Sequence, residues 1–377
     1  MPPDVIVVGA GVIGLVTAWR AAARGLRVTL VDPYLTGQAS QVAAGMLAPV
    51  GELAYGEEEL LRLGLASRDR YPEFVAELTE LTGQDTGFRV DGTLQVAFDS
   101  DDLAYLEDLR RFQETLGIAA EPLSGRECRR LEPMLAPSVR GGMLAPADGS
   151  IDPRRLTAAL HDAVERTGGT FVRARVTRVL VEGDVAAGVR LDDGTDLRAD
   201  RILLAAGSWT GRLEGLPPDL VPPIRPVKGQ VLRLRTRVPF LRRTTRGLVK
   251  GSSVYVVPRA DGEIVVGATQ EELGYDTTVT AGGVWELLRD ARELIPGLTE
   301  LRFTEVSAGL RPGSPDNAPV LGPTALPGLF LATGHFRNGV LLTPVTGEVM
   351  AEALVTGRVP ELAAAFTPDR FGREVPA

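Results

Sequence analysis

The apolar positions near the start of the chain form two patterns with glycines between them. Asp4–Val8 is dominated by β-branched residues in an unbroken run, which is typical of a strand buried on both faces. Val12–Ala23 is rich in helix formers, and the apolar segment Arg27–Val31 follows as a second strand. The pattern predicts a strand–helix–strand unit with the glycines at its first turn.

Two later segments, Ile202–Gly207 and Leu329–Gly334, are short apolar runs that each end in a small residue and a glycine. Either one alone is read as an ordinary strand that leads into a turn. In an open α/β sheet, however, ligands lie outside the carboxyl ends of the strands. The three glycine-bearing strand ends could therefore meet one extended ligand.

The segments between these strands have other periodicities. Glu57–Leu81 and Asp101–Leu116 have the spacing of charged amphipathic helices. Alternating positions predict strands that suit an antiparallel sheet, and a DDG turn between apolar runs predicts a hairpin. These strands are Val227–Arg237, Ser252–Pro258 and Glu263–Ala268, and the hairpin is Asp184–Asp200.

The turn VVGAGVIG has the spacing of a dinucleotide-binding fingerprint. Gly9 permits the tight turn, Gly11 lets the backbone approach a pyrophosphate, and Gly14 lets helix and strand pack closely. Asp32 ends the second strand, where an acid accepts the ribose hydroxyls of an adenosine. FAD and NAD share this fingerprint, but contacts at both ends of the chain are explained more easily by an extended FAD.

Charge and length limit the classes of function. The chain has 377 residues, 44% of them apolar, which suits one large unit or two coupled domains. Its net charge of −8 argues against a nucleic-acid partner. Val5–Trp19 is too short to span a bilayer, and no basic segment precedes it as in a signal peptide. We expect a cytoplasmic protein that binds neither nucleic acid nor a membrane.

The inventory of reactive side chains is small. Cys128 is the only cysteine, the histidines are His161 and His335, and the lysines are Lys228 and Lys250. No disulfide, no metal site and no Ser/His/Asp triad is expected from such a set. A cofactor would carry the chemistry.

Further segments resemble the FAD-dependent D-amino-acid oxidase family, and within it the glycine oxidases of thiamine biosynthesis. The resemblance runs nearly from end to end. It rests on VVGAGVIG, AAGMLAP (43–49), PVKGQ (226–230), YVVPR (255–259), VVGAT (265–269), AGLRPGSPD (308–316) and ATGHFRNGVLLTP (332–344).

The resemblance assigns roles to three polar residues. The arginine that matches Arg311 binds the substrate carboxylate in the family, the tyrosine that matches Tyr255 adds a hydroxyl to the same group, and Arg337 resembles a further arginine of the pocket. From the sequence alone, Arg311 would follow the strand Arg302–Leu310 at its exit, and it could equally be a solvated surface charge. Tyr255 could equally be a half-buried strand residue.

The same match assigns cofactor-binding positions throughout the chain. Ser40–Met46 is small and polar, typical of a loop against a flat ring system or of a flexible connection. The expected cofactor-binding residues are Gly9, Gly11, Val12, Ile13, Gly14, Asp32, Ser40, Ala44, Gly45, Met46, Val176, Ala206, Gly207, Trp209, Gly334, His335, Arg337, Asn338, Gly339, Val340 and Leu341.

The activity that the resemblance implies is oxidative deamination of glycine or another small amino acid. A hydride passes from Cα to FAD without a protein general base, and the products are a keto acid (glyoxylate), ammonia and, with dioxygen, hydrogen peroxide. A thiazole-synthase partner is implied in the same way, and we expect a homo-oligomer. The alternatives are a D-amino-acid or sarcosine-type dehydrogenase with another electron acceptor, a non-catalytic FAD-binding protein and an NAD dehydrogenase.

The fold class that follows is α/β plus α+β, with a Rossmann-like FAD-binding domain and an antiparallel-sheet substrate domain. The FAD-binding domain is discontinuous and comprises residues 1–50, 140–215 and 310–377. The substrate-binding domain comprises residues 51–139 and 216–309.

Three details refine this picture. Gln270 stands after VVGAT, where the compared glycine oxidase has methionine, so the preferred amine could differ. Cys128 lies in SGRECRRLEP, which predicts a helix start far from the C-terminal cysteine that holds flavin in sarcosine oxidases. We therefore expect noncovalent FAD and a packing role for Cys128. The acidic run at Glu57 predicts a helix N-terminus favoured by the dipole, with no partner implied.

Overall fold

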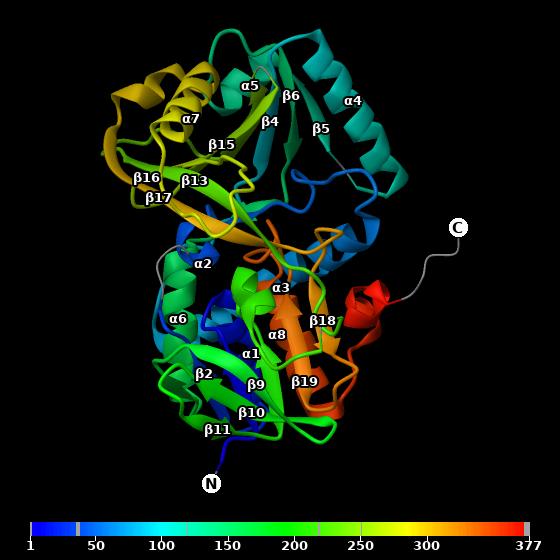
Figure 1. Ribbon diagram of the computed structural model, residues 1–377. Helices are drawn as coiled ribbons and strands as arrows, with labels where there is room; N and C mark the ends of the chain where they lie inside the picture. Colours follow the sequence, from blue (N-terminus) through cyan, green and yellow to red (C-terminus); the bar gives the residue numbers. More distant parts are fainter. Residues whose placement is uncertain (1, 35–37, 119, 218, 250, 373–377) are drawn as a thin grey trace.

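The computed structural model describes residues 2–34, 38–118, 120–217, 219–249 and 251–372. It is a mixed α/β protein with two lobes, each built on its own sheet (Figure 1). One sheet has six strands in the order β18-β19-β12-β1-β2-β8, and the other has eight in the order β17-β13-β16-β15-β14-β4-β6-β5.

The six-stranded sheet is parallel except at its β18 edge. Its strands are β1 (Val5–Val8), β2 (Val28–Val31), β8 (Thr170–Val172), β12 (Arg201–Leu204), β18 (Val320–Pro323) and β19 (Leu329–Thr333). The predicted strands Asp4–Val8 and Arg27–Val31 and the helix Val12–Ala23 are confirmed to within one residue at each end. The apolar run Ile202–Gly207 is a strand only as far as Leu204.

Both faces of this sheet are covered, which explains its unbroken apolar strands. Val5 and Val7 belong to a core shared with the helices, whereas Ile6 and Val8 belong to a core on the opposite face. The helices are α1 (Val12–Ala23), α3 (Glu58–Thr82), α6 (Pro153–Arg166) and α8 (Thr343–Thr356). The opposite face is covered by β9 (Val176–Glu182), β10 (Val185–Leu191) and β11 (Asp196–Arg198), and β10 and β11 form the predicted hairpin.

The eight-stranded sheet is mostly antiparallel, as predicted, with one parallel pair between β14 and β4. Its strands are β4 (Thr93–Ala97), β5 (Glu121–Ser124), β6 (Gly141–Ala145), β13 (Arg225–Arg235), β14 (Thr244–Val249), β15 (Ser252–Pro258), β16 (Glu263–Gly267) and β17 (Arg302–Gly313). The helices of this lobe are α4 (Ser100–Thr115), α5 (Gly125–Leu131) and α7 (Ala281–Leu294).

Two of the predicted domain limits fall at this sheet. β6 lies within the segment 140–215, which was predicted to belong to the FAD-binding domain, but it pairs with β4 and β5 of the eight-stranded sheet. The sequence could not predict this pairing, because the short GGMLA run carries no signal that distinguishes one sheet from another. β17 crosses residue 310 without a break. The division of the chain into an FAD-binding and a substrate-binding domain stays a proposal.

The predicted loop at Ser40–Met46 is only partly a loop. A short helix, α2 (Ala39–Val42), and a two-residue strand, β3 (Met46–Leu47), occupy most of it, and β3 pairs with β7 (Gly149–Ser150). Small residues permit this because they let the backbone pack closely: a Cβ on Gly45 would lie 2.0 Å from the carbonyl oxygen of Ile151.

Candidate active site

A cavity of about 460 Å³ lies where the two lobes meet. Its lining comes from the turns that follow β1, β12 and β19, from the segment around α2, and from one face of the eight-stranded sheet. The carboxyl ends of three parallel strands thus converge on one space, as the glycine-bearing strand ends predicted.

The first glycine turn has the geometry that its sequence predicts. Gly9 has φ +107°, and a Cβ there would lie 2.5 Å from the carbonyl oxygen of Ala205. A Cβ on Gly14 would lie 1.9 Å from the carbonyl oxygen of Gly9, so α1 and β1 can pack only with glycine. A Cβ on Gly11 would meet only Ser40 Oγ, at 3.4 Å. Within the protein Gly11 therefore borders open space, which fits the approach of a pyrophosphate.

Asp32 and Ser40 hold this turn from the side. The Asp32 carboxylate accepts hydrogen bonds from Ala10 N at 2.7 Å, Tyr34 N at 2.5 Å and Gln38 Nε2 at 3.2 Å. Ser40 Oγ accepts from Val12 N at 3.0 Å. Asp32 lines the cavity, and a carboxylate has lone pairs left for a ribose hydroxyl after these bonds.

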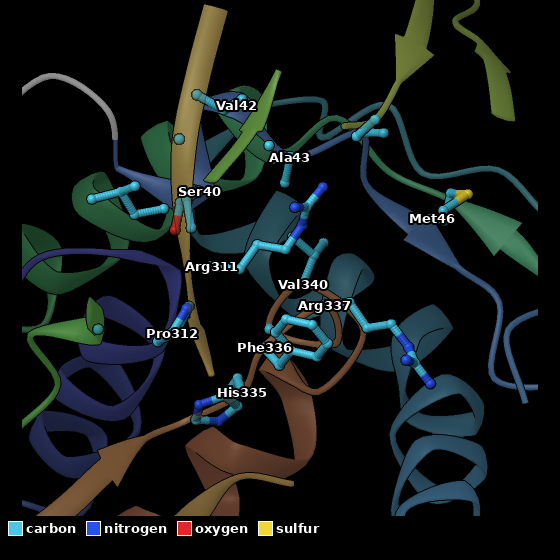
Figure 2. Close-up of a pocket in the computed structure, with 18 of the residues that line it drawn as sticks. Ser40, Val42, Ala43, Met46, Arg311, Pro312, His335, Phe336, Arg337 and Val340 are labelled. Atoms are coloured by element: carbon cyan, nitrogen blue, oxygen red, sulfur yellow. The ribbon is translucent and has the colours of Figure 1, made fainter. Parts of the chain in front are cut away.

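His335 is buried at the end of β19 and lines the cavity from below (Figure 2). Its Nε2 lies 3.1 Å from Thr346 Oγ1. Burial lowers the pKa of His335 to about 3, so its ring is neutral at physiological pH. It adds an aromatic, uncharged wall to the cavity.

Most of the expected cofactor residues border the cavity. Gly9, Gly11, Val12, Ile13, Asp32, Ser40, Ala44, Gly45, Met46, Ala206, Gly207, Trp209, His335, Arg337, Gly339 and Val340 line it. Gly14, Val176, Gly334, Asn338 and Leu341 do not. Gly14 shapes the turn from behind, and Val176 is buried in the core against the β9–β11 sheet.

Arg311 extends into the cavity near Ala43 and Val340 (Figure 2). The prediction that it lies at a strand exit is wrong, because β17 stays paired with β13 through Gly313. Its Nη1 donates to the carbonyl oxygens of Thr269 at 3.1 Å and Lys228 at 3.4 Å, and among the described residues it pairs with no carboxylate. The guanidinium is thus held by carbonyl groups and the Tyr255 hydroxyl, and it keeps donors for an anionic ligand.

Glycines on neighbouring strands make room for Arg311 and Tyr255. A Cβ on Gly229 of β13 would lie 2.4 Å from Arg311 Nη2, and a Cβ on Gly267 of β16 would lie 2.3 Å from Tyr255 Oη. Burial raises the pKa of Tyr255, and the nearby charge of Arg311 offsets part of that rise. The hydroxyl therefore keeps its proton and can donate a hydrogen bond.

Arg337 lines the same cavity but points away from Arg311, toward the start of α3 (Figure 2). Its Nη2 donates to the carboxylate of Glu57, the N-cap residue of α3. The acidic run at Glu57 begins a helix as predicted. Glu57 also has Arg337 as a partner, which is not expected from the sequence because the two residues lie 280 positions apart.

The sequence patterns do not predict several polar residues that line the cavity. Glu52 and Arg246 both line it and form an ion pair, with Arg246 Nη1 3.5 Å from Glu52 Oε1. Gln95 on β4 lines it as well. The one available signal was the closeness of Glu52 to AAGMLAP; Arg246 and Gln95 are far from any matched motif. Gln270, noted as a departure, also lines the cavity.

Asp148 supports the segment that carries Glu52. It is buried, and its Oδ2 accepts from Gly51 N at 3.0 Å. Burial raises its pKa to about 7, so the folded protein binds this proton more tightly than the unfolded chain. The contribution of Asp148 to the free energy of unfolding is therefore present at low pH and falls as pH rises toward about 7.

The variant Asp148→Asn keeps an acceptor for Gly51 N and removes the titration. Relative to wild type, its free energy of unfolding should rise by roughly 2–3 kcal/mol between pH 5 and pH 8. Urea unfolding of both proteins at the two pH values measures this difference. Parallel pH profiles would show that Asp148 is ionised in the folded protein throughout.

Cys128 lies on α5, whose N-cap Ser124 forms a capping box with Glu127, so the predicted helix start is confirmed. The thiol is buried in the core of the eight-stranded sheet, and Cys128 is not among the residues that line the cavity. In the described part of the chain, no helix is both long and apolar enough to cross a membrane.

Comparisons with known proteins identify the family of this chain. The family model "DAO: FAD dependent oxidoreductase" matches residues 4–353. Glycine oxidase of Pseudomonas aeruginosa is 35% identical, with 96% of both chains covered. The crystal structure of glycine oxidase from Geobacillus kaustophilus is similar with a TM-score of 0.90 and 33% identity, covering 98% of this chain and 99% of that one.

The bifunctional protein ThiO/ThiG of Synechocystis sp. is 36% identical over 98% of this chain. The chain spans only about half of that relative, 54% of its length. The glycine turn, with room beside Gly11, and the convergent strand ends fit a bound FAD, and the matches extend along nearly the whole chain. The chain belongs to the family of FAD-dependent oxidoreductases, and its cofactor is FAD.

Proposed function

We propose that this protein oxidises glycine or another small amino acid to the imino acid, which hydrolyses to the keto acid (glyoxylate for glycine) and ammonia while dioxygen is reduced to hydrogen peroxide. The observation that carries the proposal is Arg311, an arginine that lines the same cavity as the glycine turn and pairs with no carboxylate among the described residues. The similarity to glycine oxidases supports it.

The side chains of the cavity would orient the substrate. The Arg311 fork is suited to grip the carboxylate through two parallel N–H bonds, and the protonated Tyr255 hydroxyl adds a third donor. Bound FAD would accept the hydride from Cα. Positioning by Arg311 and Tyr255 is then the main contribution of the protein, and no protein general base is assigned.

FAD would be held without a covalent bond. The cofactor-binding residues named above that line the cavity would surround it, with the pyrophosphate beside Gly11 and the adenosine ribose at Asp32. Cys128 is buried in the core of the eight-stranded sheet and is not among the residues that line the cavity, so it is not assigned as a point of attachment. Arg337, neutralised by Glu57, would shape the wall of the substrate pocket.

The role in thiamine synthesis is part of the proposal. The relative from Synechocystis sp. is named as a bifunctional ThiO/ThiG protein, of which this chain spans about half. A separate thiazole-synthase partner would then take up the imine product. A homo-oligomer and a cytoplasmic location remain predictions.

The proposed activity predicts a change in the visible spectrum. Under anaerobic conditions the purified protein should show a flavin band that bleaches when glycine is added, because the reducing equivalents of the amine pass to FAD. Air should then restore the band with one hydrogen peroxide per amine oxidised.

A band that bleaches but recovers only with an artificial electron acceptor would favour the dehydrogenase. A band that glycine, sarcosine, D-alanine and D-proline all leave unchanged would contradict oxidation of small amino acids with a single carboxylate.

A further inference from the structure

The cavity contains a second arginine that the proposed function does not use. Arg246 on β14 lies directly opposite Gln95 on β4 and Tyr255 on β15 in the sheet register, and all three residues line the cavity. Residues paired in this way share one face of a sheet with their Cβ atoms about 5 Å apart. The strand that carries Tyr255 thus lies between the strands that carry Arg246 and Arg311.

The partners of Arg246 leave donors for a ligand. Its Nη1 donates to the carbonyl oxygen of Gly51 at 2.6 Å and lies 3.5 Å from Glu52 Oε1. A guanidinium has five N–H donors, so most of the fork is available. The side chains of Arg246 and Glu52 are only 16% and 15% exposed, which makes their charges effective within the cavity.

Gln95 adds an amide group to the lining beside Arg246. Only 8% of this residue is exposed, and its Oε1 is buried without a hydrogen-bond partner among the described residues. A buried polar atom is normally satisfied by protein, water or ligand. Ser253 and Gln270 also line the cavity, so the region around Arg246 is polar.

The cavity offers more charged groups than glycine can pair with. On the substrate side of the cavity, away from Asp32, Arg337 is hydrogen-bonded to the carboxylate of Glu57. Arg246 and Glu52 instead form a looser ion pair at 3.5 Å, without a hydrogen bond between them among the described residues, so each can also bind an opposite charge of a ligand, and Arg311 adds a second cation. Glycine has one carboxylate and one amine, so it would leave one of the two arginines without an anion of the substrate. Two carboxylates and one amine match the three charges, with the amine on Glu52 and the carboxylates on the two arginines.

We propose that the preferred substrate is an amino acid with a second carboxylate, which Arg246 binds. This inference rests on the proposed function and specifies its substrate class. The second carboxylate is attached either to the nitrogen, as in an N-carboxymethyl amino acid, or to the Cα side chain, as in D-aspartate and D-glutamate.

The test uses the FAD-loaded protein and pairs of compounds that differ only in that carboxylate. The pairs are D-aspartate with D-asparagine, D-glutamate with D-glutamine, and iminodiacetate with its monoamide. The rate of anaerobic bleaching against concentration gives a selectivity ratio for each pair. At least one pair should favour the acid more than tenfold, and the pair that does so identifies where the carboxylate is attached.

Arg246→Gln should lower that ratio by roughly 10- to 100-fold, because a hydrogen bond to a charged group contributes about 1.5–3 kcal/mol. Arg246→Lys, which keeps the charge but not the fork, should give an intermediate ratio and serves if the glutamine variant does not fold. Arg242→Gln is the matched control, since Arg242 precedes the same strand and its side chain is 69% exposed; its ratio should equal that of wild type.

Equal rates for acid and amide in every pair, or a ratio unchanged in both Arg246 variants, would overturn the proposal. Failure of the proposed function is recognised separately, because then no compound bleaches the flavin. In that case the affinity of succinate and of its monoamide, measured by perturbation of the flavin spectrum, decides the role of Arg246: the acid should bind more than tenfold tighter in wild type and not in Arg246→Gln. Equal affinities in wild type would overturn it.

Discussion

Replacing Arg311 by leucine should lower kcat/KM for the amino-acid substrate by roughly 30- to 5,000-fold. Truncating one partner of a buried, hydrogen-bonded charge pair costs about 2–5 kcal/mol, which corresponds to that range. The carboxylate would lose its fork, since Tyr255 alone offers one neutral donor. Steady-state peroxide formation measures kcat/KM, and the rate of anaerobic bleaching separates binding from flavin reduction.

Two further variants serve as controls for Arg311→Leu. Arg311→Lys should recover only part of the loss, because an ammonium cannot form the two parallel bonds of a guanidinium. Arg302→Leu, at the exposed start of the same strand, should behave like wild type. If Arg311→Leu kept its kcat/KM, the substrate carboxylate would be bound elsewhere, and Arg246 would be the first alternative.

Local features of the site could be predicted because the sequence around them imposes the geometry. Gly9 and Gly14 are required by contacts within one strand–turn–helix unit and with the adjacent strand, and the structure has both in the expected places. The apolar strands at residues 202 and 329 end beside the same cavity, since parallel strands of one sheet present their carboxyl ends together.

The positions of the proposed substrate-binding residues depend on pairing between distant strands, which the periodicity of the sequence does not reveal. Arg311 was singled out only by its resemblance to a family motif, because arginines are abundant in this chain and most lie on surfaces. Its position is explained by Gly229, about eighty residues earlier, whose missing side chain makes room for the guanidinium. The predicted strand exit before Pro312 is wrong because β17 is an edge strand, where a proline is allowed. Pro312 therefore does not end the strand.

The ion pair of Arg246 and Glu52 shows a second limit of predicting the site from the sequence. Each looks like an ordinary surface charge in the sequence, and only the meeting of β14 with the segment after β3 brings them together in the cavity. Glu57 and Arg337 are separated even further along the chain, yet they form an ion pair. Charges that pair between segments far apart in the sequence leave no pattern in either segment.

Gly11→Ala should weaken FAD binding while leaving the protein without cofactor folded. Gly11 has φ −71° and ψ 173°, which alanine adopts without strain, and the added Cβ would meet only Ser40 Oγ at an ordinary 3.4 Å. If the pyrophosphate lies against Gly11, the same Cβ overpacks the bound state by about 1–3 kcal/mol, or roughly a 5- to 150-fold higher Kd. Flavin fluorescence released on dilution of the FAD-loaded protein measures this Kd.

The neighbouring glycines separate loss of cofactor from loss of fold. Gly14→Ala would place its Cβ 1.9 Å from a backbone oxygen and should yield little folded protein, with or without FAD. Gly282→Ala on α7, where a Cβ meets nothing within 4 Å, should change neither property. Gly11→Ala should differ from both by keeping its thermal stability without FAD and losing only the affinity. A wild-type Kd for Gly11→Ala would mean that the pyrophosphate does not approach the backbone at this residue.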